Sequence, residues 1–474
     1  MSELKKPLLG PAYGTASKQE SENTVQSILD RLGFGRYQVT LGIASAISII
    51  SNGAEIAMIS LISIILESAW GLSSTELGLL GGAVFAGMSI GLSIIATWGD
   101  DWGRLFVLKL TYVGTLVLRL VCAVMPGFWS FLVFRGLTGV LQSMSSPSMM
   151  AMAVESCPSK YRGSLSSLIM SNYGVGQIYV IGLASLLTPD LEAGRWRLLL
   201  VLAALPSAAG IIMLFSKVVE SPMFSAKKGL NQAAIGSLDY IAGTNNKNQV
   251  TEKEKTQIKD LEPPNEERGF CNLRVLFDSA HRFTTLLLMG QWALTTFLYF
   301  GFFYLLPQLL RGVDSEISTF WLMSLVVVSE MLVTTSTAWL VELPSLGRKG
   351  TMKVFYGVLV FASGLCLFVT DNYVLVAAVV VISAFNQGSF CILWTYTPEV
   401  YETQVRGMSV AFLNITARAI DFFAPFVFGH LLKAAVWVPF LLVLVLGVGL
   451  VTIVFFLPVE TRGISLDTKP TNNT

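Results

Sequence analysis

Long apolar stretches constrain this chain more than any other feature, because each is about 20 residues long, the length that a helix needs to cross a bilayer. Charged residues make up only 13% of the 474 residues, about half the share that is usual in soluble domains. The mean hydropathy is +0.63. The sequence therefore predicts an all-α integral membrane protein. We place its spans at 38–66, 76–98, 105–125, 128–153, 164–187, 197–216, 283–307, 318–341, 352–370, 373–396, 408–432 and 436–457.

Six of these spans precede the polar stretch 217–282 and six follow it, and short motifs recur in the two groups in the same order. Most recurrences are 244 residues apart, and the last pair is slightly closer. Two copies of a six-helix unit are typical of secondary transporters that work by alternating access. The predicted fold is twelve transmembrane helices in two six-helix repeats. The matched positions are Glu155 and Glu399, Arg162 and Arg406, Gly103-Arg104 and Gly347-Arg348, and Glu220 and Glu460.

The duplication also predicts the domains. Lysine and arginine gather in the loops on the side of the 217–282 stretch, and the opposite side is nearly bare of cations. Since cytoplasmic loops carry an excess of cations, we expect the linker and both tails to be cytoplasmic. The choice between the plasma membrane and a vesicular or vacuolar endomembrane stays open. The expected domains are a tail at 1–37, an N-terminal bundle at 38–216, a linker at 217–282, a C-terminal bundle at 283–457 and a tail at 458–474.

Several classes of function are disfavoured by the rarer residues. The five cysteines include no CxxC pair, and the two histidines, His281 and His430, have no partner at the spacing of a metal site or a catalytic triad. The net charge of +1 gives no reason to expect nucleic acid. We therefore expect no enzyme, no metal and no cofactor, and a monomer that contacts the lipid bilayer and a small-molecule substrate.

Longer motifs resemble one family. Gly33-Phe34-Gly35-Arg36-Tyr37-Gln38 precedes the first span, Glu220-Ser221-Pro222 closes the first half, Tyr396-Thr397-Pro398-Glu399-Val400-Tyr401 precedes Arg406-Gly407, and Leu457-Pro458-Val459-Glu460-Thr461 ends the last span. These motifs resemble those of the major facilitator superfamily, in the branch of organic cation and anion transporters and synaptic-vesicle-glycoprotein-related proteins. The resemblance implies a twelve-helix transporter fold and a substrate site between the two halves.

The resemblance also implies a cytoplasmic gate, in which loop charges pair across the two halves. One loop departs from the family pattern D-R-x-G-R-R, because Asp101 stands where that pattern has a cation. A weaker gate than the family norm is therefore expected. The gate residues that the resemblance indicates are Asp100, Gly103, Arg104, Glu155, Arg162, Glu220, Gly347, Arg348, Glu399, Arg406 and Glu460.

Charged side chains inside the first-half spans are candidates for the site, because a charge at the bilayer centre costs roughly 2.5–3.5 kcal/mol. Glu55 lies in the middle of the first span, with Asn52 on the same helix face. It is either a carboxylate that takes up a cationic substrate or a proton, or one partner of a permanent ion pair. The resemblance implies that Arg135 on the fourth span is the cation beside it. Of these alternatives, proton coupling at Glu55 is the working hypothesis.

The second half carries further charges within its spans. Arg418 and Asp421 lie three residues apart, with Asn414 one turn before Arg418, and Glu330 lies in the middle of the eighth span. Arg418 and Asp421 either pair with each other along one helix or, if Asp421 turns away, leave Arg418 to bind an anionic substrate. We expect Glu330 to pair with Arg418 across the cavity.

Aromatic and amide side chains fall in the spans that usually form the central cavity of this fold, and aromatic faces suit organic cations and flat heterocycles. These candidates are Tyr173, Gln177, Gln291, Trp292, Tyr299, Asn386, Gln387 and Trp394. The sequence thus predicts a transporter of a small organic ion or polar nutrient, with or without a coupled proton. Two alternatives stay open, a sugar facilitator and a membrane receptor or vesicle protein that keeps the fold without transport.

Overall fold

The computed structural model describes residues 24–191, 194–261, 273–279, 281–311, 317–369 and 371–462. Within these ranges the regular structure is entirely helical, as predicted. Every predicted span corresponds to one helix or to two helices separated by a break. The first six spans are α2 (Arg36–Trp70), α3 (Ser74–Trp102), α4 (Arg104–Val124), α5 (Phe128–Glu155), α6 with α7 (Arg162–Met170, Tyr173–Leu187) and α8 with α9 (Trp196–Ala203, Leu205–Ser216).

The last six spans follow the same pattern. They are α13 (Arg282–Arg311), α14 (Thr319–Leu340), α15 (Gly347–Leu365), α16 (Asn372–Val400), α17 with α18 (Thr403–Asp421, Ala424–Ala434) and α19 (Val438–Phe456). Nine described spans are long and apolar enough on their own to cross a membrane, and α5, the pair α6 and α7, and α15 complete the twelve. The prediction of twelve transmembrane helices is confirmed. Helices such as α2 extend beyond the predicted window because hydropathy marks the hydrocarbon core and not the helix ends.

Local sequence sets where these helices begin and break. Ser73 accepts a hydrogen bond from the Glu76 N–H (3.3 Å) while the Glu76 carboxylate accepts one from the Ser73 N–H (2.8 Å), which caps the start of α3. Pro206 lacks an N–H at the break between α8 and α9, so the Leu202 carbonyl loses its partner in the helix. The Tyr179 hydroxyl donates to that carbonyl instead, at 2.7 Å.

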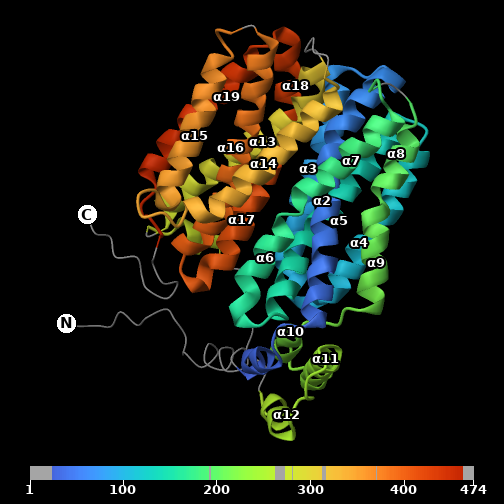
Figure 1. Ribbon diagram of the computed structural model, residues 1–474, viewed down its shortest axis with the longest axis vertical. Coiled ribbons are helices and arrows are strands. Elements are labelled where there is room, and N and C mark those ends of the chain that lie inside the picture. Colours follow the sequence, from blue (N-terminus) through green and yellow to red (C-terminus); the bar gives the residue numbers. More distant parts are fainter. Residues whose placement is uncertain are drawn as a thin grey trace, which may run out of the picture.

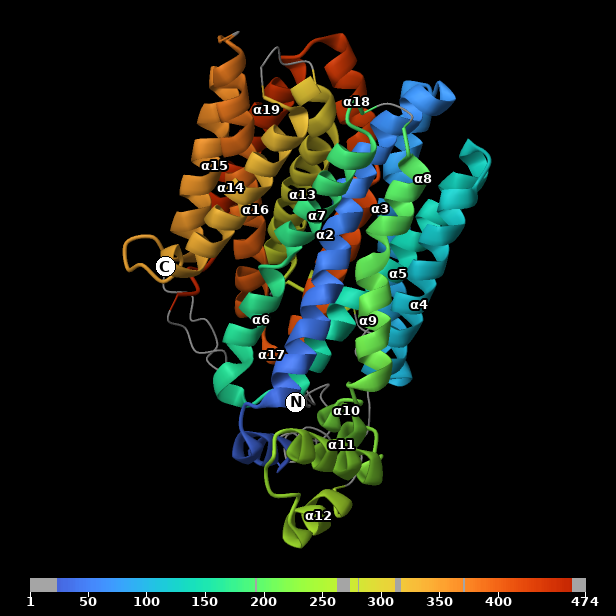
Figure 2. The ribbon, with the colours of Figure 1, turned by 45° about the vertical axis from the view of Figure 1, so that its right-hand side comes forward.

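The helices form two groups that lie side by side (Figures 1 and 2). Helices α2 to α9 make one group and α13 to α19 the other, in keeping with the sequence duplication. Contacts between the groups are made by α3 with α17 and α18, by α7 with α14, and by α2 with α13. Any site between the two halves must therefore be lined by these helices and by the helices next to them.

A small helical layer covers one end of the first group, and we call this side the α10–α12 end (Figure 1). It contains α10 (Pro222–Lys227), α11 (Asn231–Thr244) and α12 (Glu252–Lys259), together with helical residues 24–32. Arg31 donates two hydrogen bonds of 2.8 Å to the Glu254 carboxylate, and Asp30 accepts from the Ser159 N–H at 2.7 Å. Burial opposes ionisation of Asp30, but the two Ser159 hydrogen bonds and the nearby Arg162 charge lower its pKa. Residues 217–261 of the predicted linker are thus folded against the first half.

The contact between α2 and α7 depends on glycine. A Cβ atom at Gly176 would lie 2.0 Å from the Ile50 carbonyl oxygen of α2, whereas a Cβ at Gly182, further along the same helix, would meet nothing within 4 Å. We expect Gly176→Ala to lower the melting temperature of the purified protein by overpacking, at a cost of roughly 1–3 kcal/mol. Gly182→Ala is the matched control and should melt like the wild type. Equal melting of both variants would contradict this close approach.

Candidate functional site

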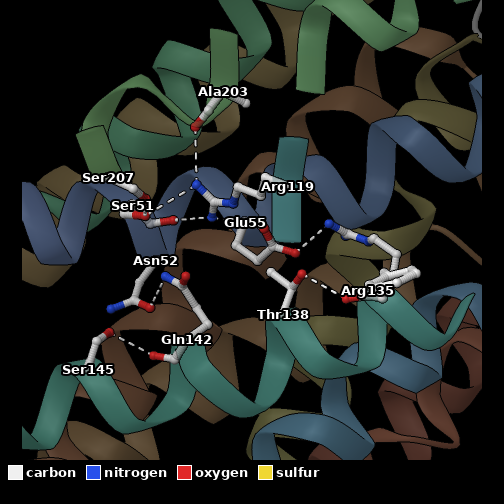
Figure 3. A network of polar contacts seen from close by, with 11 residues as sticks. Ser51, Asn52, Glu55, Arg119, Arg135, Thr138, Gln142, Ser145, Ala203 and Ser207 are labelled. Carbon is white, nitrogen blue, oxygen red and sulfur yellow. Dashed lines mark hydrogen bonds and ion pairs between the residues drawn. The ribbon is translucent and has the colours of Figure 1, made fainter. Parts of the chain in front are cut away.

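Three buried charges from three helices form a cluster in the first group (Figure 3). The Glu55 carboxylate of α2 lies 2.9 Å from Arg119 Nη2 of α4 and 2.6 Å from Arg135 Nη1 of α5, one arginine at each oxygen. Each of the three side chains is at most 3% exposed. We call this set the Glu55 cluster. With two arginines and one glutamate, it carries a net charge of one positive.

Arg119 is held by more than Glu55. Its guanidinium donates to the Ser51 carbonyl (3.2 Å), the Ser51 hydroxyl (3.3 Å) and the Ala203 carbonyl (3.1 Å), which lies at the break before α9. The sequence analysis did not include Arg119 among its candidates. The signal was present, because Arg119 is the one charged residue in the stretch 110–125 and so needs a buried partner.

The geometry around Glu55 matches the ion-pair interpretation of this residue. Each carboxylate oxygen faces an arginine. A buried carboxylate with two cations is stabilised in its ionised form. Proton uptake at Glu55 stays a prediction.

Polar side chains continue from the Glu55 cluster along one face of α5 (Figure 3). Thr138, Gln142, Ser145 and Ser148 follow Arg135 at spacings of three or four residues, which places them on the same side of the helix. Gln142 donates to the Asn52 amide oxygen, and the Asn52 amide donates to Ser146 at 2.5 Å. Asn52 thus belongs to this polar stripe and does not contact Glu55.

Arg418 and Asp421 pair with each other in the second group. Arg418 Nη1 lies 3.3 Å from Asp421 Oδ2, and Asp421 also accepts a hydrogen bond from the Thr296 hydroxyl at 2.8 Å. The Arg418 guanidinium sits 4.4 Å from the centroid of the Phe300 ring. The predicted pair along one helix is therefore observed, and Arg418 is already neutralised by its neighbour.

Glu330 has a different partner from the one expected. Its Oε2 accepts a hydrogen bond from the Tyr299 hydroxyl (3.3 Å), which in turn accepts one from the Gln177 amide (3.2 Å). The expected pair with Arg418 is wrong in this structure, because Arg418 is held by Asp421. Gln177 belongs to the first half and the other two residues to the second, so this chain of hydrogen bonds joins the halves.

Other predicted residues leave polar atoms without partners. Among the described residues, both amide atoms of Gln291 and the side-chain oxygens of Asn386, Gln387 and Asn414 are buried without a hydrogen-bond partner. Trp292 instead donates to Thr397 (2.9 Å) and packs at right angles to Trp394, with ring centroids 5.0 Å apart. Tyr173 packs where α7 crosses α2, since its carbonyl oxygen lies against Gly53. The unpaired amides come from α13, α16 and α17 and could hydrogen-bond a polar ligand.

A cavity of about 260 Å³ lies between the two halves. It reaches the α10–α12 end at Arg104, whose guanidinium stacks on Phe224 of α10. Ser148 of the polar stripe lines it on one side, and Trp394 and Asn414 line it on the other. The cavity thus touches both halves and several predicted binding residues.

The halves meet at the opposite end. Lys433 donates to Ser74 at 2.6 Å, Tyr304 donates to the Leu77 carbonyl at 3.2 Å, and Ser60 donates to the Phe303 carbonyl at 3.0 Å. Each of these bonds links a helix of the first half with one of the second. The molecule is therefore closed at this end, while a cavity separates the halves at the α10–α12 end.

In each half, the predicted gate residues form an arginine–glutamate ion pair and a second glutamate accepts a hydrogen bond from the backbone. In the first half, Arg104 pairs with Glu155 (3.3 Å), and Glu220 accepts a hydrogen bond from the Leu105 backbone N–H (3.1 Å). In the second, Arg348 pairs with Glu399 (3.1 Å), and its own backbone N–H donates to Glu460 (2.8 Å). The glycines have φ of +87° (Gly103) and +64° (Gly347), which L side chains rarely adopt.

These pairs lie within each half, so the expected pairing of charges across the halves is not what the described residues show. The cavity at this end separates the two sets. Arg162 donates to the Val154 carbonyl (3.0 Å) and contacts Gln26, and Arg406 lies in the first turn of α17. The Asp100 side chain lies outside the described residues. Burial raises the pKa of Glu220, although backbone N–H groups of Ser221 and Leu105 oppose the shift.

Comparisons with known proteins agree with this architecture. The sequence model of the Major Facilitator Superfamily matches residues 41–425. The Synaptic vesicle 2-related protein of Pongo abelii is 28% identical, covering 93% of this chain and 81% of that protein. The Niacin transporter NiaP of Acinetobacter baylyi is 24% identical, covering 93% and 98%. The inward open conformation of the xylose transporter XylE from E. coli shares the fold, with a TM-score of 0.72, 16% identity, and 91% and 98% coverage.

The Glu55 cluster should behave as one unit in a mutant cycle. Glu55→Gln leaves two buried arginines without an acid and should lose about 3–5 kcal/mol of stability. Arg119→Gln keeps the Glu55–Arg135 pair but removes the hydrogen bonds to Ser51 and Ala203, so it should lose less. The double variant should lose less than the sum of the two, because neutral amides replace both charges. Lys109→Gln, which removes a cation of α4 that packs on Phe215, is the control and should melt like the wild type. Additive losses in the cycle would show that Glu55 and Arg119 act independently.

Proposed function

The chain belongs to the Major Facilitator Superfamily, and on that premise we propose that it carries a small organic ion or polar nutrient across its membrane by alternating access. It is a multi-pass membrane transporter, and its relatives are transporters and not enzymes. The substrate is a small molecule. Its identity and its coupling to a proton belong to this proposal.

The observation that carries the proposal is the difference between the two ends of the molecule. A cavity of about 260 Å³ separates the halves at the α10–α12 end, while three interhalf hydrogen bonds join them at the other. This is the shape expected of one end state of a carrier whose halves rock about a central site. In the other end state, the hydrogen bonds of Lys433, Tyr304 and Ser60 would break and the cavity would close.

The two halves act as rigid units in this mechanism, with the boundaries 38–216 and 283–457. The internal pairs of each gate support that division, because Arg104 with Glu155 and Arg348 with Glu399 hold their own half together. We place the α10–α12 end in the cytoplasm, since lysine and arginine gather there. Similarity to synaptic vesicle 2-related proteins favours a vesicular membrane.

The unpaired amide atoms of Gln291, Asn386, Gln387 and Asn414 support a polar substrate. A buried donor or acceptor without a partner costs about 1–3 kcal/mol, so a ligand that satisfies several of them gains affinity. The similarity to a protein named as a niacin transporter favours a small heterocyclic nutrient. Neutral amides would also suit a sugar, which keeps the sugar facilitator as the second candidate.

Proton coupling, if present, is better placed at Glu330 than at Glu55. Glu55 has an arginine at each oxygen, whereas Glu330 accepts one bond from Tyr299 and its other oxygen has no partner. An isolated buried carboxylate is costly, and a bound proton or cation removes that cost. The hydrogen-bond chain from Glu330 to Gln177 spans the two halves, so a proton there would act on their contact.

Alternating access makes a prediction about distances at the two ends. Spin labels at Ile95 and Val410, which line the cavity on α3 and α17, should approach each other in a second population, while labels at Ser74 and Lys433 should separate. Double electron–electron resonance on protein in lipid nanodiscs measures both pairs. A change of pH or addition of a transported solute should shift both distributions in opposite directions.

A labelled pair within one half, such as Ser74 with Leu137, provides the control and should keep a single distance. Fixed distances at both ends under all conditions would favour the non-transporting receptor or vesicle protein. Counterflow of radiolabelled nicotinate and of a hexose through proteoliposomes then separates the organic-ion candidate from the sugar candidate.

A further inference from the structure

We infer that the substrate is a monovalent organic anion that moves together with one proton, with the anion bound at Arg135 and the proton at Glu330. This inference rests on the proposed function and names the substrate class and the stoichiometry of that transport. It follows from where the buried charges of the two halves lie and from which of them have partners.

The first half holds an excess positive charge at mid-depth. Glu55 is shared between Arg119 and Arg135, and no second acid lies within ion-pair distance of either arginine among the described residues. Arg119 is satisfied by Glu55, Ser51 and Ala203. The excess charge therefore belongs to Arg135, which has the fewest partners of its own.

Arg135 also has N–H groups that could donate hydrogen bonds to a ligand. Its Nη1 faces Glu55, but Nε and Nη2 are buried and have no hydrogen-bond partner. A guanidinium with two adjacent unpaired N–H groups matches the two oxygens of a carboxylate. Arg418 offers less, because it already pairs with Asp421 and lies over Phe300.

A polar route connects this group with the cavity. Ser148 lines the cavity, and Ser145, Gln142 and Thr138 lead from it to Arg135 along one face of α5 (Figure 3). The side chains of this stripe present oxygen and nitrogen along one buried face of α5. Closure of the halves at the α10–α12 end would press a substrate in the cavity toward this stripe.

The second half holds the matching negative charge. Glu330 lies on α14, and no cation is within ion-pair distance of its carboxylate among the described residues. It accepts a hydrogen bond from the Tyr299 hydroxyl of α13, and Tyr173 of α7 lies near both Glu330 and Arg418 of α17. Helix α16 brings no charged side chain before Glu399, and α15 brings Tyr356 at this depth.

These two charges explain why both ligands should move together. The empty carrier holds one positive charge in the first half and one negative charge in the second, and the fully loaded carrier holds neither. The two charges of the empty carrier therefore sum to zero, as do those of the loaded carrier. With only the anion or only the proton bound, the carrier holds a net charge in a site of low dielectric constant, which disfavours rearrangement of the halves. The proton adds to a Glu330 oxygen from water on one side and leaves to water on the other, with no other bond changed.

The first test is ligand binding by the purified full-length protein, with two matched pairs of probes: nicotinate with nicotinamide, and butyrate with butyramide. We expect one of the carboxylates to raise the melting temperature and its amide to have no effect. The carboxylate shift should be larger at mildly acidic pH than at mildly alkaline pH, because proton binding at Glu330 favours anion binding. An amide that stabilises the protein as well as its acid, or the absence of any carboxylate shift, would overturn the inference.

The second test measures transport of the same carboxylate into proteoliposomes. Electroneutral cotransport of one proton with each anion should give about tenfold accumulation for each pH unit of gradient, since one pH unit and a tenfold concentration ratio are the same free energy. The accumulation should not change when a potassium gradient and valinomycin set the membrane potential. Accumulation that follows the potential would contradict the stoichiometry.

Variants separate the two sites. Glu330→Gln imitates the protonated acid, so it should bind the carboxylate equally at both pH values, exchange it across the membrane and fail to accumulate it. Arg135→Gln should lose carboxylate binding, and Lys109→Gln should keep all three properties. If Arg135→Gln does not fold, Glu330→Gln still tests the inference. Carboxylate binding that remains pH-dependent in Glu330→Gln would refute the role of Glu330.

These results are distinguishable from failure of the proposed function. Opposite distance changes at the two ends, combined with transport that is insensitive to a proton gradient, would leave alternating access standing and reject only the coupled anion. Fixed distances together with pH-dependent carboxylate binding would reject transport and keep the anion site.

Discussion

The structure of the first half depends on Glu55 and the two arginines that hold it. The cluster ties α2 to α4 and α5, and through the Ala203 carbonyl Arg119 also reaches the break between α8 and α9. In an apolar bundle these charges could not be buried singly, because breaking a buried pair costs about 3–5 kcal/mol. Packing of four helices is therefore coupled to one carboxylate, which makes the first half a rigid unit and favours movement at the interface between halves.

The repeat explains which features the halves share and which they do not. Both copies keep the glycine with positive φ, the arginine after it, and the two acids that hold them. At the 244-residue offset, however, Glu55 corresponds to Tyr299, Arg119 to Ser363 and Arg135 to Val379. The ends of the two bundles are thus conserved within the chain, while their centres have diverged: the position of Glu55 in the charged cluster is taken by Tyr299, a member of a hydrogen-bond chain.

Hydropathy and repeated motifs predicted the fold closely, since a span of about 20 apolar residues has few alternatives to a membrane helix. The family resemblance gave Arg135 as the partner of Glu55, and spacing gave the pair of Arg418 with Asp421. Arg119 was missed because neither the resemblance nor its spacing pairs it with Glu55, which lies on another helix. The pairing of Glu330 with Tyr299, and the gate pairs within each half, depend on which helices meet and on which end is open, and one-dimensional spacing contains neither.

The divergence of the two centres suggests why a duplicated transporter benefits from unlike halves. Two identical charged centres would repel each other across the interface, and two neutral ones would give no preference for an ion. Here Tyr299 stands between Gln177 and Glu330, so the position that carries the acid in the first half carries, in the second, the hydroxyl that links the halves. A polar contact at that point can form and break without burying a new charge, whereas the Glu55 cluster stays intact. The first half is therefore held rigid by the Glu55 cluster, and the second half supplies, through Tyr299, the hydrogen bond between the halves that can break and re-form.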